Sequence, residues 1–270
     1  MTCVTRLLCV VQSLVFSLSC YATASEAVLT SIESRAQQLT DLSDRIWDLA
    51  EVGYQETLSS NALQDALLAE GFSIESGVAS IPTAFVASYG SGEPVIAIMG
   101  EFDALPGISQ AAVPVAQTIE GKKAAHACGH HLFGAGSAGA AMAVKEWLDR
   151  TKTSGTVQFF GTPAEEGGSG KVYMVRAGLF DDVDTVIHWH PSSVNSADSA
   201  STLANRSAKF TFTGVSSHAA SAPERGRSAL DAVESMNFMV NLLREHVPSS
   251  TRLHYVITNG GATPNVVPNT

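Results

Sequence analysis

The sequence predicts an α/β protein with a mostly parallel sheet and flanking helices, followed by a smaller, incomplete α+β domain. Over residues 25–204, compact runs of β-branched and aromatic residues alternate with stretches of helical period, which indicates a largely parallel sheet. From residue 205 the order changes to strand, helix, strand. The 270 residues, of which 45% are hydrophobic, suffice for two domains with buried cores.

Helices and strands alternate along the first domain. Apolar residues recur every three or four positions over 31–49 and again over 58–68, which predicts two amphipathic helices. Further helices are expected at 132–148, where small side chains allow close approach to a sheet, and at 171–177. Runs typical of strands occupy 84–89, 95–99, 157–160 and 186–189. Because such sheets bind ligands at the carboxyl ends of their strands, functional residues are expected there.

A second domain is predicted for residues 205–270. A strand is expected at 209–213, a helix at 228–246 and a second strand at 252–258. This unit supplies only part of a small sheet and leaves an edge strand without a partner. We therefore expect the natural sequence to continue beyond Thr270.

The N-terminal segment 1–24 has the features of a secretory signal. Arg6 precedes a long uncharged run, and the small residues before the expected cleavage after Ala24 fit a signal-peptidase site. A membrane anchor is the alternative, but the run is interrupted by Gln12 and is shorter than the ~20 residues that a bilayer needs. The sequence therefore predicts a periplasmic or secreted protein with no membrane partner after cleavage.

Charge and cysteine content narrow the function further. A net charge of −10 argues against nucleic acid as a partner. Cys3, Cys9 and Cys20 all lie in the predicted signal, so Cys128 is the lone thiol of the mature chain. An unpaired thiol in an oxidising compartment needs a function or burial.

Four clusters of polar residues follow predicted strands or precede a helix. They span 101–106, 126–131, 162–168 and 188–191. Cys128 and His130 place two zinc-ligand types one residue apart at the start of a helix. A buried, inert Cys128 is one alternative, and a thiol nucleophile with His126 or His130 as its base is another.

Carboxylates and histidines in the other clusters suit metal chemistry. Of the adjacent Glu165 and Glu166, one can bind a metal while the other acts as general base on water, although a solvated acidic turn is the alternative. His188 and His190 share one face of an extended segment, so either could bind metal or simply pack as a core histidine. Asp103 is placed to orient a ligand imidazole.

The clusters in this order resemble the co-catalytic zinc amidohydrolases and peptidases, which include aminoacylases, hippurate hydrolases and indoleacetyl-amino-acid hydrolases. The motifs H-A-C-G-H, E-E-G-G and G-V-S-S-H-A-A-S-A-P-E-R-G-R-S-A-L-D-A carry the resemblance, which runs from about residue 30 to the end. The adjacent H-P at 190–191 and its spacing from Asp184 are similar to the p-aminobenzoyl-glutamate hydrolase branch, and this favours His190 over His188.

The resemblance implies a role for each matching residue. It implies two divalent metal ions, zinc or else manganese or cobalt, with ligands at Cys128, His130, Glu166 and His190. It implies that Glu165 is the catalytic base and that His218 reaches a neighbouring subunit's site to stabilise the oxyanion. Two departures stand out, because His131 replaces a common Asp and the family's final histidine ligand is absent from these 270 residues.

By the same resemblance, the expected activity is hydrolysis of the amide bond of N-acyl or N-aroyl amino acids, p-aminobenzoyl-glutamate among them, or of dipeptides. The substrate is a small molecule with an amide bond and a free carboxylate. The resemblance also implies a zinc-peptidase-like catalytic domain at 25–204 and a partial ferredoxin-like lid at 205–270, through which a homodimer forms. A non-catalytic protein that kept this fold to bind a metal or ligand is the alternative.

Overall fold

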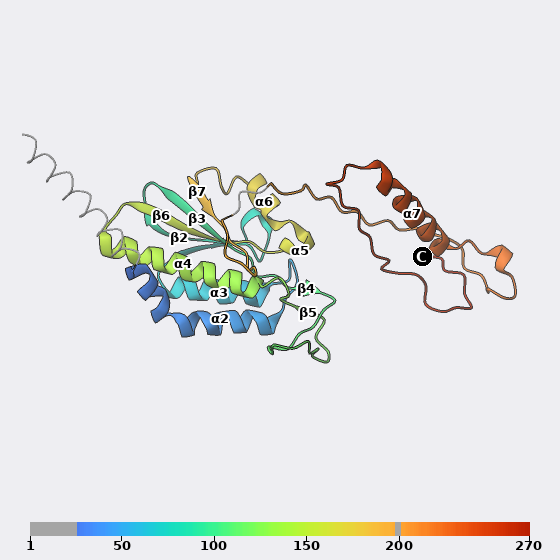
Figure 1. The fold of residues 1–270 in the computed structure, drawn as a ribbon, viewed down its shortest axis with the longest axis horizontal. Helices are drawn as coiled ribbons and strands as arrows, with labels where there is room; N and C mark the ends of the chain where they lie inside the picture. Colours follow the sequence, from blue (N-terminus) through green and yellow to red (C-terminus); the bar gives the residue numbers. More distant parts are fainter. Residues whose placement is uncertain (1–25, 198–200) are drawn as a thin grey trace, which may run out of the picture. The chain divides into compact units, whose positions relative to one another are not determined.

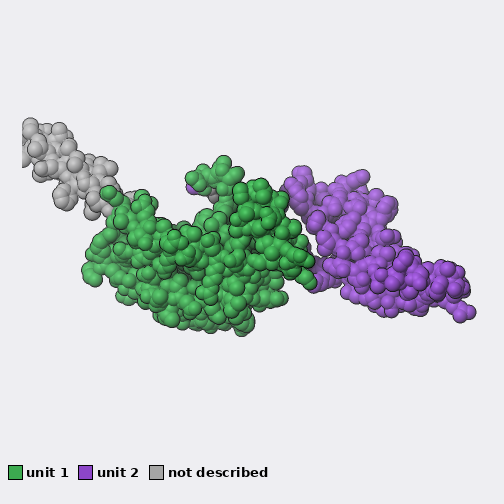
Figure 2. All heavy atoms as spheres, turned by 90° about the horizontal axis from the view of Figure 1, so that it is seen from below, with its two compact units in different colours: residues 1–196 green, residues 197–270 purple. Residues whose placement is uncertain are grey.

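The computed structural model of the protein describes residues 26–197 and 201–270. The chain forms two compact units, Met1–Ser196 and Ala197–Thr270 (Figure 2). The predicted signal segment 1–24 lies outside the described residues, and the domain boundary predicted after residue 204 stays a prediction. Across the described ranges, no helix combines the length and the apolar character that crossing a membrane requires.

A five-stranded sheet in the order β1-β2-β6-β3-β7 forms the centre of the first unit (Figure 1). Its strands are β1 Ser73–Ser76, β2 Phe85–Ser91, β3 Val95–Gly100, β6 Gly155–Gly161 and β7 Thr185–Ile187. The four predicted strands are β2, β3, β6 and β7. The sheet is mixed rather than mostly parallel, since β3 runs parallel to β6 and β7 while β2 is antiparallel to β1 and β6.

One antiparallel pair of the sheet, β1 with β2, has a local cause. A short connection through Gly77, whose φ of 72° is left-handed, joins β1 and β2, and antiparallel strands need only such a short link. β1 is mostly exposed and carries little apolar signal, which is why it was not predicted from the sequence. The predicted α/β fold class is otherwise confirmed.

Helices cover both faces of this sheet. The helices α2 Ala36–Leu49, α3 Thr57–Ala69 and α4 His130–Thr151 pack against one another on one face (Figure 1). The short α6 Gly170–Arg176 packs at the other face, where Met174 is fully buried. Successive residues of β6 point to opposite faces of the sheet. Phe159 therefore packs into the hydrophobic core beneath α2, α3 and α4, and Phe160 into the core beneath α6.

Small residues let α4 lie against β3. A Cβ atom on Gly134 would stand 2.8 Å from the backbone oxygen of Glu101, so only glycine fits at this contact. Gly100 packs closely against the Phe159 ring, since a Cβ atom on Gly100 would stand 2.7 Å from the ring carbon Cζ. The close approach brings His130, at the start of α4, to the carboxyl end of β3.

The second unit contains the predicted helix but not the predicted strands. Helix α7, Ala229–Leu243, begins after Ser228, whose side chain accepts a hydrogen bond from the Asp231 amide. The segments 209–213 and 252–258 form no strand. Their strand propensity is satisfied only when another segment pairs with the backbone, and no such partner exists among the described residues.

We expect Gly134→Ala to lower the free energy of unfolding, although alanine is favoured over glycine inside a helix by about 1 kcal/mol. The new methyl group would push α4 away from the Glu101 carbonyl, at a cost of about 1–3 kcal/mol for an overpacked contact. Urea unfolding of the wild-type and variant proteins measures the difference. A variant more stable than the wild type would contradict the close contact.

Candidate metal centre

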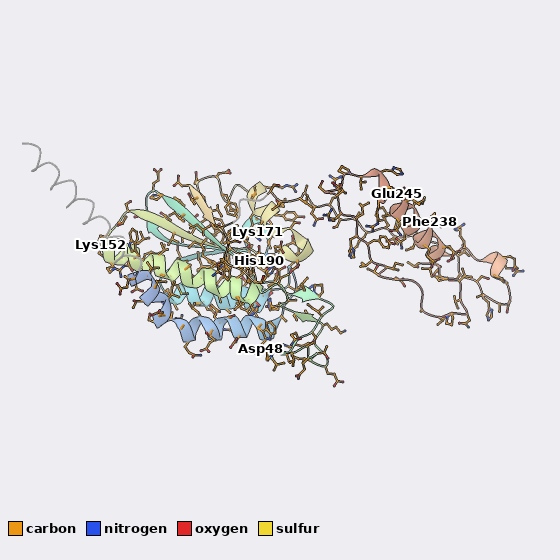
Figure 3. The ribbon with its side chains drawn as sticks, viewed as in Figure 1. Asp48, Lys152, Lys171, His190, Phe238 and Glu245 are labelled. Atoms are coloured by element: carbon orange, nitrogen blue, oxygen red, sulfur yellow. The ribbon has the colours of Figure 1, made fainter. Side chains whose placement is uncertain are left out.

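Three strand ends and one helix start bring the polar clusters together. Because β3, β6 and β7 are parallel neighbours, the residues that follow them lie at one edge of the sheet. Glu101 and Asp103 follow β3, Glu165 and Glu166 follow β6, and His190 follows β7. Figure 3 shows His190 and Lys171 in this region of the first unit.

His130 is held in one orientation by Asp103. The histidine is only 1% exposed, and its Nδ1 atom lies 3.0 Å from both the backbone oxygen and the Oδ1 atom of Asp103. Both partners are acceptors, so Nδ1 donates to them, and Nε2 is the ring nitrogen that a metal could bind once its own proton has left. The predicted contact between Asp103 and a candidate ligand imidazole is thereby confirmed.

The second oxygen of Asp103 reaches the glutamate loop, residues 162–168, which contains the short α5 Glu165–Gly168. The backbone N–H of Glu166 donates to Asp103 Oδ2 at 2.8 Å. Asp103 is 1% exposed, and both of its carboxylate oxygens accept hydrogen bonds. One accepts from the histidine that starts α4, and the other accepts from the segment after β6. A single carboxylate thus sets the distance between two of the predicted clusters.

Candidate ligand atoms gather in two groups. Glu101, His130 and His190 form one group and His130, Glu165 and Glu166 the other, with the ligand atoms of each group within 4.8 Å of one another. The Nδ1 of His190 donates to the Pro191 carbonyl at 2.9 Å, which leaves its Nε2 with a free lone pair. The structure thus brings together three of the four predicted ligands and the predicted base, while the individual roles stay predictions.

Cys128, the fourth predicted ligand, lies beside this cluster. It is half-buried in the turn before α4, close to the Glu166 carboxylate. The interaction with Glu166, together with burial and the surrounding carboxylates, raises the pKa of the thiol to about 11. In the metal-free protein the thiol is therefore protonated at neutral pH, and a metal ion would have to displace its proton.

Glu101 begins the predicted cluster 101–106, but no role of its own was predicted for it from the sequence. Its side chain is 4% exposed, and Oε2 lies 3.0 Å from His130 Nε2. Its other oxygen contacts the Lys171 ammonium and lies 3.6 Å from His188 Nε2. Burial raises the pKa of Glu101, but these neighbours outweigh it and hold the pKa well below its usual range. The position directly after β3, two residues before Asp103, was the available signal.

The donor set fits a divalent metal ion. Glu101 Oε2, His130 Nε2 and Glu166 Oε1 are buried, and among the described residues none of them makes a hydrogen bond of regular geometry, although the first two atoms lie 3.0 Å apart. Carboxylate oxygens and imidazole nitrogens are metal ligands, and Cys128 adds a thiolate donor that favours zinc. Burial lowers the pKa of His130, but Asp103 and Glu101 together raise it to about 10, so a proton occupies Nε2 until a cation replaces it.

Glu165 has the environment expected of a base. Its side chain is 47% exposed and its Oε2 lies 3.9 Å from His130 Nε2. Partial burial, and then the negative charge of Glu101, raise the pKa of Glu165 above its ordinary value. A carboxylate with a raised pKa is a better proton acceptor near neutral pH.

His188 and His131 take positions outside the two candidate groups. His188 packs edge-on against Phe133, with ring centroids 5.0 Å apart, and faces Glu101. His131 packs against Trp47 and His126, at centroid distances of 4.8 and 5.2 Å. Burial lowers the pKa of His131 to about 4, so this ring is neutral.

His218 belongs to the second unit, where its tautomer is fixed locally. Its Nδ1 accepts hydrogen bonds from the backbone amides of Ala220 and Ser221, at 3.2 and 3.1 Å. The neutral ring therefore carries its proton on Nε2, which can act as a hydrogen-bond donor. The role predicted for His218 in a neighbouring subunit stays a prediction.

Sequence comparison decides the family. The sequence model of Peptidase family M20/M25/M40 matches residues 97–259, which is more than half of the chain. The chain belongs to this family. The M20 match confirms the resemblance drawn from the H-A-C-G-H and E-E-G-G motifs, both of which lie within the matched region.

Relatives of the M20 chain agree with this assignment. It is 48% identical over 239 residues to one subunit of the p-aminobenzoyl-glutamate hydrolase of Escherichia coli, covering 88% of this chain and 50% of the relative. The chain thus spans about half the length of this curated relative. A dinuclear metal-binding M20 peptidase from Bacillus subtilis matches with 28% identity and a TM-score of 0.50, over 57% of this chain and 42% of that one.

A second solved structure supports the fold alone. The aminobenzoyl-glutamate utilization protein from Klebsiella pneumoniae has a TM-score of 0.57 at 20% identity, and the match covers 90% of this chain and 66% of that one. The M20 fold and the candidate ligand groups therefore agree with a metal-binding peptidase.

We expect the alkylation rate of Cys128 in the metal-free protein to rise about tenfold per pH unit from pH 8 to pH 10, since the thiolate is the reactive form and its pKa is about 11. Zinc should then protect the thiol if Cys128 is a ligand. Mass spectrometry of chain lacking residues 1–24 follows this single cysteine. A plateau near pH 8.5 would contradict the raised pKa, and equal labelling with and without zinc would reject ligation.

Proposed function

We propose that this chain is part of a metal-dependent amidohydrolase that cleaves the amide bond of N-acyl or N-aroyl amino acids, with dipeptides as a second substrate class. One observation carries the proposal: Glu165 lies next to His130 and Glu166 in a group of potential metal ligands at the carboxyl edge of the sheet. The 48% identical relative is named as part of a p-aminobenzoyl-glutamate hydrolase, and this name supports an N-aroyl amino acid as substrate.

The chain's own residues suit hydrolysis by an activated water. Cys128, His130, Glu166 and His190 would hold two divalent metal ions, which supply Lewis acidity toward the amide carbonyl and the attacking water when bound. Glu165 accepts the proton of that water and then delivers it to the leaving nitrogen. Asp103 holds the His130 ring and the Glu166 backbone in fixed positions during the reaction. The thiolate donor favours zinc over manganese or cobalt.

In a dimer, the second unit of one subunit would complete the site of the neighbouring subunit. The Nε2–H of His218 would donate to the oxyanion that forms as water attacks the carbonyl. The guanidinium groups of Arg206, Arg225 and Arg227 belong to the same unit and could attract the free carboxylate of the substrate. These contributions make the second unit a lid in function.

A homodimer through the second unit is part of the proposal. Helix α7 exposes large apolar side chains, with Phe238 64%, Met239 60% and Leu242 52% accessible. Apolar surface of this kind is typical of a protein interface. The relative's description as one of several subunits raises hetero-assembly as the competing arrangement. Export to the periplasm or medium rests on the predicted signal 1–24.

We expect Glu165→Gln in the full-length protein to retain metal while turnover of p-aminobenzoyl-glutamate falls by about 10²–10⁴, because the base is lost and the ligands remain. Glu166→Gln should lose metal instead. Metal analysis and amide-hydrolysis assays with N-aroyl amino acids and dipeptides give both readouts. Reversed effects would overturn the two role assignments, and a metal-loaded wild-type protein that hydrolyses neither substrate class would overturn the function.

We expect His218→Ala to lower kcat by about 10²–10³ with metal content unchanged, since one oxyanion donor is removed. Mixing this variant with Glu165→Gln should restore part of the activity, because a heterodimer holds one site with both groups. Subunit exchange is verified by mass measurement of differently tagged chains. Exchange without rescue would show that His218 does not act across the dimer.

A further inference from the structure

The α3 leader, residues 53–56, contacts the loop that carries Glu165 and Glu166. Within it, Glu56 is fully buried, and its Oε1 accepts a hydrogen bond from the Ala164 backbone N–H at 2.8 Å. Its Oε2 accepts from the Thr83 hydroxyl at 3.0 Å. A carboxylate at the start of α3 thus binds the backbone amide of the residue that precedes the proposed base.

Glu56 does not serve the helix that it begins. It occupies the N-cap position of α3, yet its side chain makes no capping hydrogen bond. Glu51 caps the helix instead, accepting from the Leu58 and Ser59 backbone amides at 3.1 and 2.8 Å. The Glu56 side chain is therefore available for the glutamate loop.

The loop has a conformation that its own sequence does not favour. Ala164 is fully buried with φ at 56°, in the left-handed region that non-glycine residues rarely adopt. Such a conformation persists only where surrounding contacts impose it. Here the amide before Glu165 donates to Glu56 and the amide after it, that of Glu166, donates to Asp103.

Two further contacts of the leader reinforce this arrangement. The Tyr54 hydroxyl donates to the Gly168 carbonyl at 2.5 Å, beyond the two glutamates. Gly53 lies so close to Ala164 that a Cβ on it would stand 3.0 Å from the Ala164 Cα. The leader therefore contacts the loop on both sides of Glu165.

Burying Glu56 is costly, and no cation offsets the cost. Among the described residues, no lysine, arginine or histidine nitrogen lies within ion-pair distance of its carboxylate. Burial, its largest influence, raises the pKa of Glu56. A buried carboxylate without a counter-ion destabilises the fold unless its hydrogen bonds compensate, and those bonds end on the Ala164 amide and Thr83.

We propose that Glu56 is a positioning residue for amide hydrolysis, which fixes the Ala164 peptide and thereby directs the Glu165 carboxylate toward the reacting water. The inference rests on the proposed function for the identity of the base. Displacement of a catalytic group by about 1 Å can lower the rate about 10²-fold. Loss of Glu56 should therefore affect kcat far more than KM.

The test compares three variants in the full-length, metal-loaded protein. Glu56→Ala removes the acceptor, whereas Glu56→Gln keeps an amide oxygen for the Ala164 N–H and presents its NH₂ to Thr83. Glu51→Ala is the matched control, because it removes hydrogen bonds at the same end of α3 without touching the loop. We expect kcat to fall about 10–100-fold in Glu56→Ala, with KM within about twofold, and to recover largely in Glu56→Gln.

A second readout follows the loop without catalysis. Amide hydrogen exchange at Ala164, in metal-free and metal-loaded protein, should accelerate in Glu56→Ala and stay slow in Glu56→Gln and Glu51→Ala. Unfolding by urea reports general stability for all three. Should Glu56→Ala fail to fold, Glu56→Asp keeps the charge but shortens the reach, and it should show the same kcat loss and faster exchange.

The outcomes separate this inference from the proposed function. Unchanged Ala164 exchange in Glu56→Ala, or equal kcat losses in Glu56→Ala and Glu51→Ala, would overturn the positioning role. Equal defects in Glu56→Gln and Glu56→Ala would also overturn it, since the amide oxygen would then give no rescue. A wild-type protein without hydrolase activity would refute the proposed function, while the exchange comparison would still decide whether Glu56 holds the loop.

Discussion

The candidate site depends on one buried carboxylate whose two oxygens both accept hydrogen bonds. Asp103 accepts from His130 with one oxygen and from the Glu166 amide with the other, so the start of α4 and the end of β6 are tied through a single side chain. The contact with His130 could not form if α4 stood further from β3. The glycine at position 134, which lets the helix reach the Glu101 carbonyl, is therefore as much a part of the site as the ligands.

Electrostatics explain why such a site binds a cation. Glu101, Asp103, Glu165 and Glu166 bring four carboxyl groups to one edge of the sheet, and within the described part of the chain Lys171 is the one lysine paired with them. In the metal-free protein the charged His130 ring offsets part of this excess, and the Cys128 thiol stays protonated and so adds no further negative charge. A divalent ion would replace both protons with a stronger positive charge, so metal binding and proton release are linked.

Local sequence patterns predicted much of this fold. The features that were not predicted depend on contacts between residues far apart in the sequence. The apolar runs located β2, β3, β6 and β7, and the motifs located the cluster around Cys128 and His130. Glu56 was not predicted, and Glu101 was placed in a cluster but given no role, because their partners lie far away in sequence, 108 residues in the case of Ala164 and 70 in the case of Lys171. In the second unit, residues 252–258 have a high strand propensity but form no strand, because no described segment pairs with them.

Strand β6 links the chemistry of the site to the stiffness of the protein. Two adjacent residues of this strand, Phe159 and Phe160, fill the hydrophobic cores on opposite faces of the sheet, and the glutamate loop begins shortly after them. The loop is thus anchored in the part of the molecule that opens only when both cores come apart. Thermal fluctuations that fray an exposed loop elsewhere on the surface would leave this one in place, so the arrangement of Glu165 and Glu166 should persist until the sheet itself unfolds.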